Sequence, residues 1–142
     1  MSSAPRYTRI MEIQTELDRI GEYLAAQDDL RLAIVYGSLA KGRATSESDL
    51  DIAVAGEKSL KADRKMALIR GLAGVTGRAI DLVDLKTTGE PLLGQILAGG
   101  KRLIGDNRHY AELVTRHLFD QADFLPYRER LLAERRKAWI QQ

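Results

Sequence analysis

The chain contains no cysteine and only two histidines among its 142 residues. Without cysteine it can form no disulfide, present no thiol nucleophile and build no thiolate zinc site, and two histidines are too few for a typical zinc centre. Any metal that this protein binds is therefore expected to have oxygen ligands, which carboxylates supply.

Long apolar runs are also absent from the sequence. A helix that crosses a bilayer needs about 20 apolar residues, and the N-terminus lacks the apolar stretch and small-residue cleavage site of a secretion signal. With 44% hydrophobic and 30% charged residues, the composition is typical of a soluble globular domain. We expect a cytoplasmic protein that does not contact a membrane.

A strong net charge is the third absence, since the formal net charge is +2 with a pI of about 9.0. Such a small excess gives little attraction for nucleic acid. A basic run does occur at 128–137, but Glu129 and Glu134 interrupt it, as is usual on a solvated helix. We expect no direct binding of nucleic acid. The role of this basic run is then either to dock a partner or simply to keep the protein soluble.

Hydrophobic periodicity predicts that helices and strands alternate along the chain. Apolar residues at three- and four-residue steps predict helices, and short apolar or alternating runs predict strands. Gly71, Gly74 and Gly77 are expected to mark the end of the second helix. The predicted helices are 7–26, 59–77 and a short one near Pro91, and the predicted strands are 30–37, 48–56, 78–85 and a small one around Leu103.

The C-terminal segment 108–142 predicts one long helix or two, because Pro126 breaks or kinks a helix. The order of elements indicates an α/β or α+β fold with a small mixed sheet flanked by helices and a C-terminal helical extension. The length suits a single domain, 1–142, whose core is expected at about 30–105.

The stretch 35–54, VYGSLAKGRATSESDLDIAV, carries the residues most typical of a binding site. Gly37 allows a sharp turn at the end of a strand, and Ser38 then lies at the N-terminus of a short helix, where unpaired N–H groups attract anions. With Lys41 and Arg43 in the following loop, we expect a grip on a polyphosphate. The alternatives are a simple N-cap for Ser38 and solvated loop charges for the two basic residues.

Three aspartates are expected beside this turn. Asp49 and Asp51 alternate with apolar residues and so share one face of a strand, and Asp81 points off the apolar face of the next strand. Mg²⁺ bound by carboxylates and substrate phosphates would relieve the repulsion between them. Asp81 is then a second-metal ligand or the base that takes a hydroxyl proton, whereas Asp84 has the opposite parity. The alternative is a solvent-facing sheet edge.

The pattern Gly37-Ser38, ten residues, then Asp49-x-Asp51 resembles the polymerase β-like nucleotidyltransferase superfamily. The small size resembles that superfamily's minimal nucleotidyltransferases, the MNT type. The resemblance covers about 30–105. Further matching positions are Ala40, Gly42, Ser48, Val54 and the later strand residue Asp81.

This resemblance implies a specific activity. Proteins of the MNT type are commonly paired with a HEPN-domain ribonuclease toxin and act as its antitoxin, using ATP and Mg²⁺ to transfer AMP onto a toxin tyrosine. By the resemblance Gly37 and Ser38 bind the nucleotide phosphates, Asp49 and Asp51 bind metal, and Asp81 is the third carboxylate. Two alternatives are a nucleotidyltransferase for a small molecule such as an aminoglycoside, and a noncatalytic antitoxin that acts by docking alone.

Overall fold

The structure is a computed structural model that describes residues 6–140, with the side chains of 8–122 and 130–138. Its order of helices and strands is the predicted one. The elements are α1 (Arg6–Ala25), β1 (Leu30–Tyr36), α2 (Gly37–Ala40), β2 (Leu50–Gly56), α3 (Ala62–Thr76), β3 (Ile80–Asp84), α4 (Leu92–Gly99), β4 (Lys101–Ile104) and α5 (Asn107–Ile140).

Four strands form one mixed sheet in the order β3-β2-β1-β4. Strand β1 is antiparallel to both β2 and β4, while β2 and β3 are parallel. A parallel pair needs a crossover connection, and α3 supplies it between β2 and β3. The predicted small mixed sheet is therefore confirmed.

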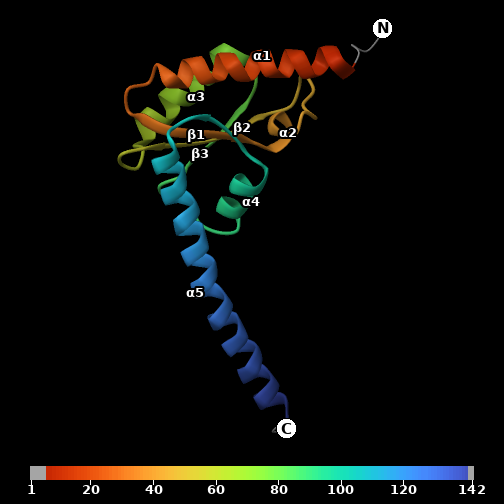
Figure 1. The fold of residues 1–142 in the computed structure, drawn as a ribbon, viewed down its shortest axis with the longest axis vertical. Coiled ribbons are helices and arrows are strands. Elements are labelled where there is room, and N and C mark those ends of the chain that lie inside the picture. The colour runs from red at the N-terminus through yellow and green to blue at the C-terminus, as the bar shows by residue number, and fades with distance from the viewer. Residues whose placement is uncertain (1–5, 141–142) are drawn as a thin grey trace.

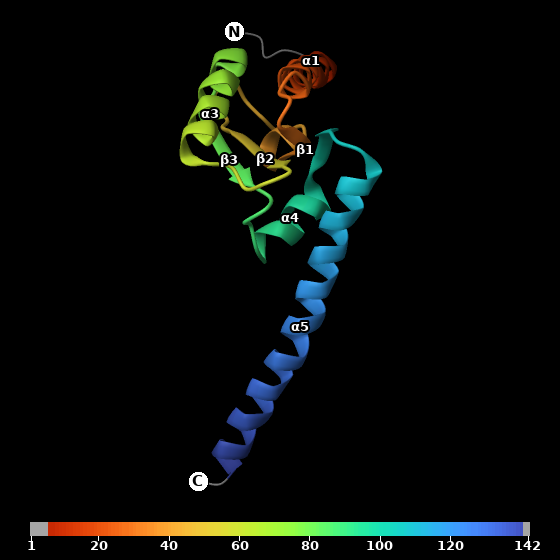
Figure 2. The same cartoon turned by 90° about the vertical axis from the view of Figure 1, so that its left-hand side faces the viewer.

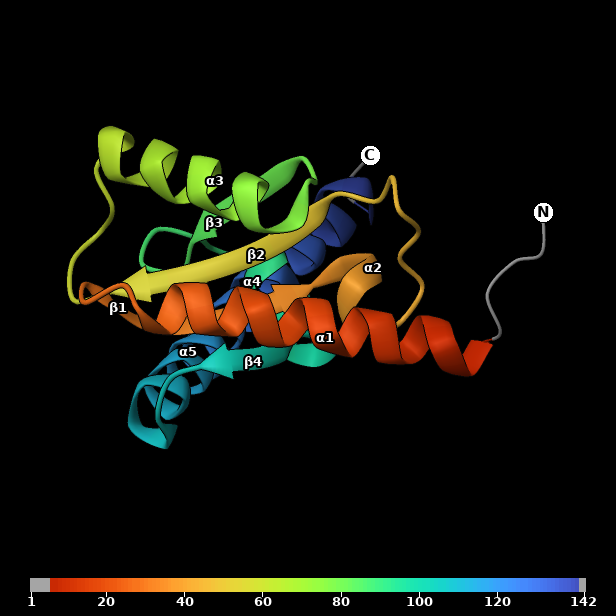
Figure 3. The same cartoon turned by 90° about the horizontal axis from the view of Figure 1, so that it is seen from above.

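Helices cover both faces of this sheet (Figures 1 and 2). Helices α1 and α3 lie side by side over one face, as the view from above shows (Figure 3), and bury residues such as Ile20 and Leu72. Helix α4 and the start of α5 cover the other face, where Leu93 and Leu113 are buried. Because both faces are covered, the stretch of β1 after Arg31 is a continuous buried apolar run from Leu32 to Val35 instead of an alternating one.

Helix α3 ends at the last of the three glycines that were expected to mark its end. Gly71 and Gly74 lie inside the helix, and only Gly77 ends it, with φ at 69° and its N–H donating to the Ala73 carbonyl at 2.8 Å. A Cβ at Gly71 would collide with the Tyr23 hydroxyl of α1. The missing side chain at Gly71 therefore allows α1 and α3 to approach each other.

Helix α5 is one helix of 34 residues that continues through Pro126. Near its start it is tied to the body by a hydrogen bond between His117 Nδ1 and Glu90 Oε1. Its distal part projects away from the sheet (Figures 1 and 2). Among the side chains of α5 that the structure describes, large apolar ones are exposed at Leu118, Phe119, Leu131 and Leu132. Across 6–140, neither this helix nor another has an apolar stretch long enough to span a membrane.

Candidate active site

Gly37 lies where β1 passes into α2, and its backbone conformation suits glycine. Its φ of 72° is in the left-handed region that residues with side chains avoid. A Cβ at this position would also collide with the carboxylate of Asp51 on β2. The backbone of the predicted phosphate-binding turn therefore packs directly against a predicted metal ligand.

Ser38 is the second residue of α2, so the alternative of an N-cap role is wrong. The helix begins at Gly37, and Tyr36 occupies the N-cap position without a side-chain hydrogen bond to the helix. Because α2 has only four residues, few peptide dipoles align, and an anion would gain less from the helix than a longer one would give. The groups suited to a phosphate are the backbone N–H groups of the turn and the half-buried Ser38 hydroxyl.

Lys41 and Arg43 are exposed in the connection between α2 and β2. The Arg43 N–H donates to the Ser38 carbonyl at 2.9 Å, which folds the loop back over α2. Lys41 extends toward the end of α4, where its Cε lies 3.9 Å from the position of a Cβ on Gly99. Neither side chain forms an ion pair with another described residue, so both charges are accessible to an anionic ligand.

Strand pairing brings Asp51 and Asp81 together with an aromatic residue that the sequence did not single out. Asp51 is paired with Tyr36 across the antiparallel ladder and with Asp81 across the parallel one. Directly paired residues point to the same face of a sheet. Ala53, two residues after Asp51, packs on the face covered by α4 and α5. The three side chains therefore form a row on that face, at the end of the sheet where α2 begins.

The negative charges in and beside this row raise the pKa values of Asp51 and Tyr36. Burial raises the pKa of Asp51, and the charges of Asp81 and Asp49 and a hydrogen-bonding contact with Asp81 raise it further. Burial, followed by the charges of Asp81 and Asp51, raises the pKa of Tyr36 to about 12. A cation bound here would reverse this effect, because it favours the charged carboxylates.

Asp49 lies one residue before β2 and is exposed, so the predicted strand 48–56 begins too early. The β2–β3 ladder starts with Leu50, so Asp49 lies outside it. The negative charge of Asp49 still acts on the row, because it raises the pKa of Asp51. Within the residues that the structure describes, no group of three or more His, Cys, Asp or Glu side chains is arranged to hold a metal ion by itself. The donor set fits an ion such as Mg²⁺, which takes one or two carboxylates and completes its shell with substrate phosphates.

Asp84 stands apart from this row. It is buried, and its carboxylate accepts the N–H groups of Leu60 at 2.7 Å and Lys86 at 2.9 Å. The parity argument that set Asp84 apart from Asp81 is confirmed, because Asp84 holds the segments that flank α3 and β3 instead of facing the other aspartates.

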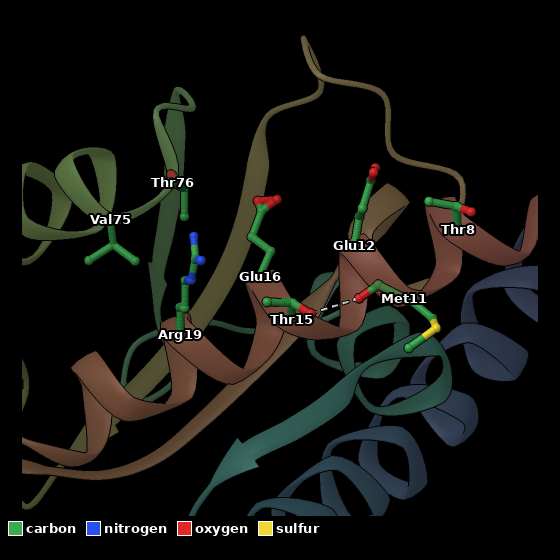
Figure 4. A pocket seen from close by; sticks show the side chains of 8 residues that line it. All are labelled: Thr8, Met11, Glu12, Thr15, Glu16, Arg19, Val75 and Thr76. Atoms are coloured by element: carbon green, nitrogen blue, oxygen red, sulfur yellow. Dashed lines mark hydrogen bonds between the residues drawn. The ribbon is translucent and has the colours of Figure 1, made fainter. Parts of the chain in front are cut away.

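A hollow of about 470 Å³ lies between α1 and the end of α3 (Figure 4). It is lined by α1 side chains between Thr8 and Arg19 and by Val75 and Thr76 of α3. These helices cover the sheet face opposite to the row of aspartates, and none of the predicted site residues lines the hollow. The hollow is therefore separate from the candidate active site.

The family model described as "Polymerase beta, Nucleotidyltransferase" matches residues 6–109 of this chain. The match runs from α1 to the start of α5 and includes every predicted site residue. Among curated proteins, the protein adenylyltransferase MntA of Shewanella oneidensis is 34% identical over 76 residues, which are 54% of this chain and 55% of that protein. The chain thus spans about half the length of the curated relative that it matches.

Solved structures share the fold. A toxin-antitoxin with AMP-PNP superposes with a TM-score of 0.71 at 24% identity, covering 83% of this chain and 96% of that one. A complex of tri-AMPylated Shewanella oneidensis HEPN toxin with MNT antitoxin gives a TM-score of 0.69 at 23% identity, covering 86% of this chain and 97% of that one. At these identities the similarity is one of fold.

Proposed function

Because the chain belongs to the polymerase β nucleotidyltransferase family, we propose that it transfers AMP from ATP to a protein. The acceptor that we propose is a tyrosine hydroxyl of a HEPN-domain ribonuclease toxin, which the transfer silences. The chain would then act as the antitoxin of that partner.

The observation that carries this proposal is the contact of Gly37 with the carboxylate of Asp51, beside Asp81. It joins a turn suited to phosphates with carboxylates suited to Mg²⁺ at one end of the sheet. We assign the metal to Asp49, Asp51 and Asp81. Bound there, Mg²⁺ would supply positive charge that stabilises the transferring phosphoryl group and the leaving pyrophosphate.

The residues of the chain have separate tasks in this reaction. The turn at Gly37 and Ser38 binds the triphosphate through backbone N–H groups and the serine hydroxyl, and Lys41 and Arg43 add charge-assisted contacts to phosphate oxygens. Asp81, exposed at the start of β3, orients the acceptor hydroxyl and takes its proton. The acceptor oxygen bonds to the α-phosphorus, and the bond to pyrophosphate breaks.

A protein acceptor is supported by both the relatives and the shape of this chain. The relative that matches half of the chain is named a protein adenylyltransferase, and one structural neighbour contains an AMPylated HEPN toxin. Here α5 extends from the sheet face that carries the aspartates (Figure 2). Leu118 and Phe119 on this helix are exposed. Exposed large apolar side chains on a projecting helix suit the docking of a protein.

Adenylylation would silence a ribonuclease by simple electrostatics. An attached AMP adds a negatively charged phosphate and bulk, and negative charge near an RNA-binding site repels the phosphates of the substrate. The modified tyrosine is therefore expected close to the catalytic groups of the toxin, on a segment that can reach the α-phosphorus in line.

Coexpression with a HEPN-domain ribonuclease as the partner tests this proposal. We expect the intact mass of the partner to increase by one or more AMP units with the parent chain and by none with Asp49→Ala. The partner's ribonuclease activity should be lost in parallel with the mass increase. Asp18→Ala, which removes an exposed carboxylate of α1, is the matched control and should behave as the parent.

The outcome that contradicts the enzymatic proposal is equally direct. If Asp49→Ala silences an unmodified toxin as well as the parent does at matched concentration, neutralisation occurs by docking alone. If AMP is found on a residue other than tyrosine, the transferase activity stands and the acceptor is corrected.

A further inference from the structure

Arg78 connects three segments that meet behind the candidate active site. It lies between α3 and β3, three residues before Asp81. Its guanidinium donates to the Glu16 carboxylate of α1 at 2.7 Å from Nε and 3.0 Å from Nη2. The same group donates from Nη1 to the carbonyls of Thr45 at 2.6 Å and Ser48 at 2.8 Å. One side chain therefore holds α1, the start of β3 and the loop before β2.

The position of Arg78 is itself fixed by the end of α3. Gly77 ends the helix in the left-handed conformation, and the Arg78 N–H donates to the Thr76 hydroxyl at 3.1 Å. The Arg78 side chain is 9% exposed and that of Glu16 is 20% exposed. Figure 4 shows Glu16 projecting from α1 at the rim of the hollow. An ion pair with fork-shaped geometry and little solvent holds its partners more firmly than an exposed pair.

The contact with Ser48 determines where Asp49 lies. The Ser48 carbonyl belongs to the same planar peptide unit as the Asp49 N–H, so holding this carbonyl fixes the backbone on one side of Asp49. On the other side, the Leu50 N–H donates to the Ala79 carbonyl at 2.9 Å. Asp49 is thus held between two contacts with the segment that leads into β3.

The loop needs such an anchor because charge repulsion acts on it. Asp49 is exposed, and it lies only two residues before Asp51, which carries the same charge. Without a cation, the repulsion between these carboxylates favours movement of the loop away from β2, since Asp49 lies outside the strand ladder. A clamp on the backbone beside Asp49 opposes that movement and keeps the carboxylate close to Asp51 and Asp81 before metal and nucleotide bind.

We propose that Arg78, held by Glu16, is a positioning residue that keeps Asp49 in place to bind the metal ion. This inference rests on the proposed function for its consequence in catalysis. Partners that orient metal ligands typically contribute about 10- to 100-fold to metal affinity. The pair Arg78 and Glu16 would act in this way through the backbone of the loop, without touching the ion.

Arg78→Lys tests the clamp, because it keeps the charge and removes the forked geometry. The matched control is Arg64→Lys. Arg64 donates to both carboxylate oxygens of Asp29, at 2.7 and 2.6 Å, and to Gln27, at the end of the sheet away from Asp49. Both variants lose a multidentate arginine, but only Arg78→Lys loses contacts with the loop.

Two measurements on the full chain are needed. In hydrogen exchange without ligand, we expect the peptide amides of 45–50 to exchange faster in Arg78→Lys and at the parental rate in Arg64→Lys. In calorimetric titration of Mg²⁺ into protein saturated with AMP-PNP, we expect the apparent dissociation constant of Mg²⁺ to rise about tenfold or more in Arg78→Lys. Glu16→Gln keeps Arg78 but removes the ion pair, and should show smaller changes of the same sign.

Each contrary result overturns a defined part of the inference. Unchanged exchange of 45–50 in Arg78→Lys shows that no clamp exists. Faster exchange with unchanged Mg²⁺ affinity, or equal loss of affinity in Arg64→Lys, shows that Arg78 is structural only. A parent that binds no Mg²⁺ with AMP-PNP refutes the proposed function and with it the positioning role, whereas a normal parent beside an unaffected Arg78→Lys refutes the positioning role alone.

Discussion

Gly37 and Gly42 offer a matched pair of left-handed glycines, with φ at 72° and 69°. Alanine at either position imposes a left-handed conformation that costs about 1–2 kcal/mol. At Gly37 the new Cβ would also collide with the Asp51 carboxylate, whereas at Gly42 it would meet no atom within 4 Å. In urea unfolding we expect both variants to lose stability, and Gly37→Ala to lose more because of this collision. Under the proposed function, only Gly37→Ala should lose AMP transfer to a coexpressed partner. Equal transfer by the two variants would contradict a role for this contact.

Single residues of the site could be predicted where a local rule applies. Gly37 follows from its place at the end of a strand, and Asp51 and Asp81 follow from strand parity, which needs only the sequence around each residue. Tyr36 was missed because its approach to the two aspartates depends on the register between strands. Arg78 was missed for a similar reason, since its partners are 30 or more positions away in the chain. The sequence does offer one signal for Tyr36. Its position in the alternation of β1 places its side chain on the same face of the strand as apolar residues of β1.

Alanine substitutions at two glycines of α3 distinguish the effect of helix propensity on stability from the effect of packing. Glycine inside a helix is about 0.5–1 kcal/mol less favourable than alanine. Gly74→Ala meets no neighbouring atom within 4 Å, so we expect the free energy of unfolding to rise by about that amount. Gly71→Ala would push the Cβ against the ring of Tyr23, and we expect it to be less stable than Gly74→Ala. Urea unfolding of both variants measures the difference, and equal stabilisation would mean that Tyr23 moves away freely.

The ion pair between Asp29 and Arg64 ties the residue before β1 to α3 and should make stability depend on pH. The hydrogen bond from Arg64 lowers the pKa of Asp29 below its usual 3.8. A carboxylate with a lowered pKa in the folded state stabilises the fold above the unfolded pKa, and this stability is lost as the pH falls through the folded pKa. Asp29 is about half exposed (47%), so we expect Asp29→Asn to cost about 1 kcal/mol or less at neutral pH.

The pH profile decides whether this pair is the cause. The difference in unfolding free energy between the parent and Asp29→Asn should shrink below about pH 3.8 and vanish at lower pH. A difference that stays constant down to acid pH would show that the asparagine disturbs packing and that the charge is unimportant.

At the scale of elements, periodicity predicted the order of helices and strands correctly. The polymerase β-like fold that the sequence motif indicated is also confirmed. Element ends were less accurate for a physical reason. Strand β2 begins at Leu50 because pairing with β3 begins there, and pairing partners are distant in sequence. Similarly, whether a helix continues past Pro126 depends on the balance between one lost hydrogen bond and the preferences of its neighbours, which periodicity does not measure.

The whole molecule divides into a packed body and a projecting helix. Leu113 is buried, and Arg116 still donates to the Thr88 carbonyl at 3.0 Å, but the described side chains from 118 to 122 and from 130 to 138 are exposed. We expect removal of residues 121–142 to change the unfolding free energy by about 0.5 kcal/mol or less. The same truncation should abolish co-purification with the HEPN-domain partner that we propose.

Two measurements check this division. Thermal unfolding of the truncated chain should show a melting temperature close to that of the parent, and size-exclusion chromatography with the partner should show separate peaks. A truncated chain that melts much earlier would mean that the distal helix supports the body. A truncated chain that still elutes with the partner would place the docking surface elsewhere.

Because α5 continues as one helix from the body to its far end, rotation and distance along it are coupled. Each residue turns the next by about 100° and advances it by about 1.5 Å. A partner bound to the distal part is therefore held at an angle around the helix axis. This angle is fixed by the number of residues between the bound part and His117. Adding two residues there would rotate that partner by about 200° around the helix axis, to the far side from the aspartates. Adding seven residues would nearly restore its angle around the axis, at a greater distance along the helix. Under the proposed function, the length of this helix thus sets the direction from which a docked acceptor would approach the candidate active site.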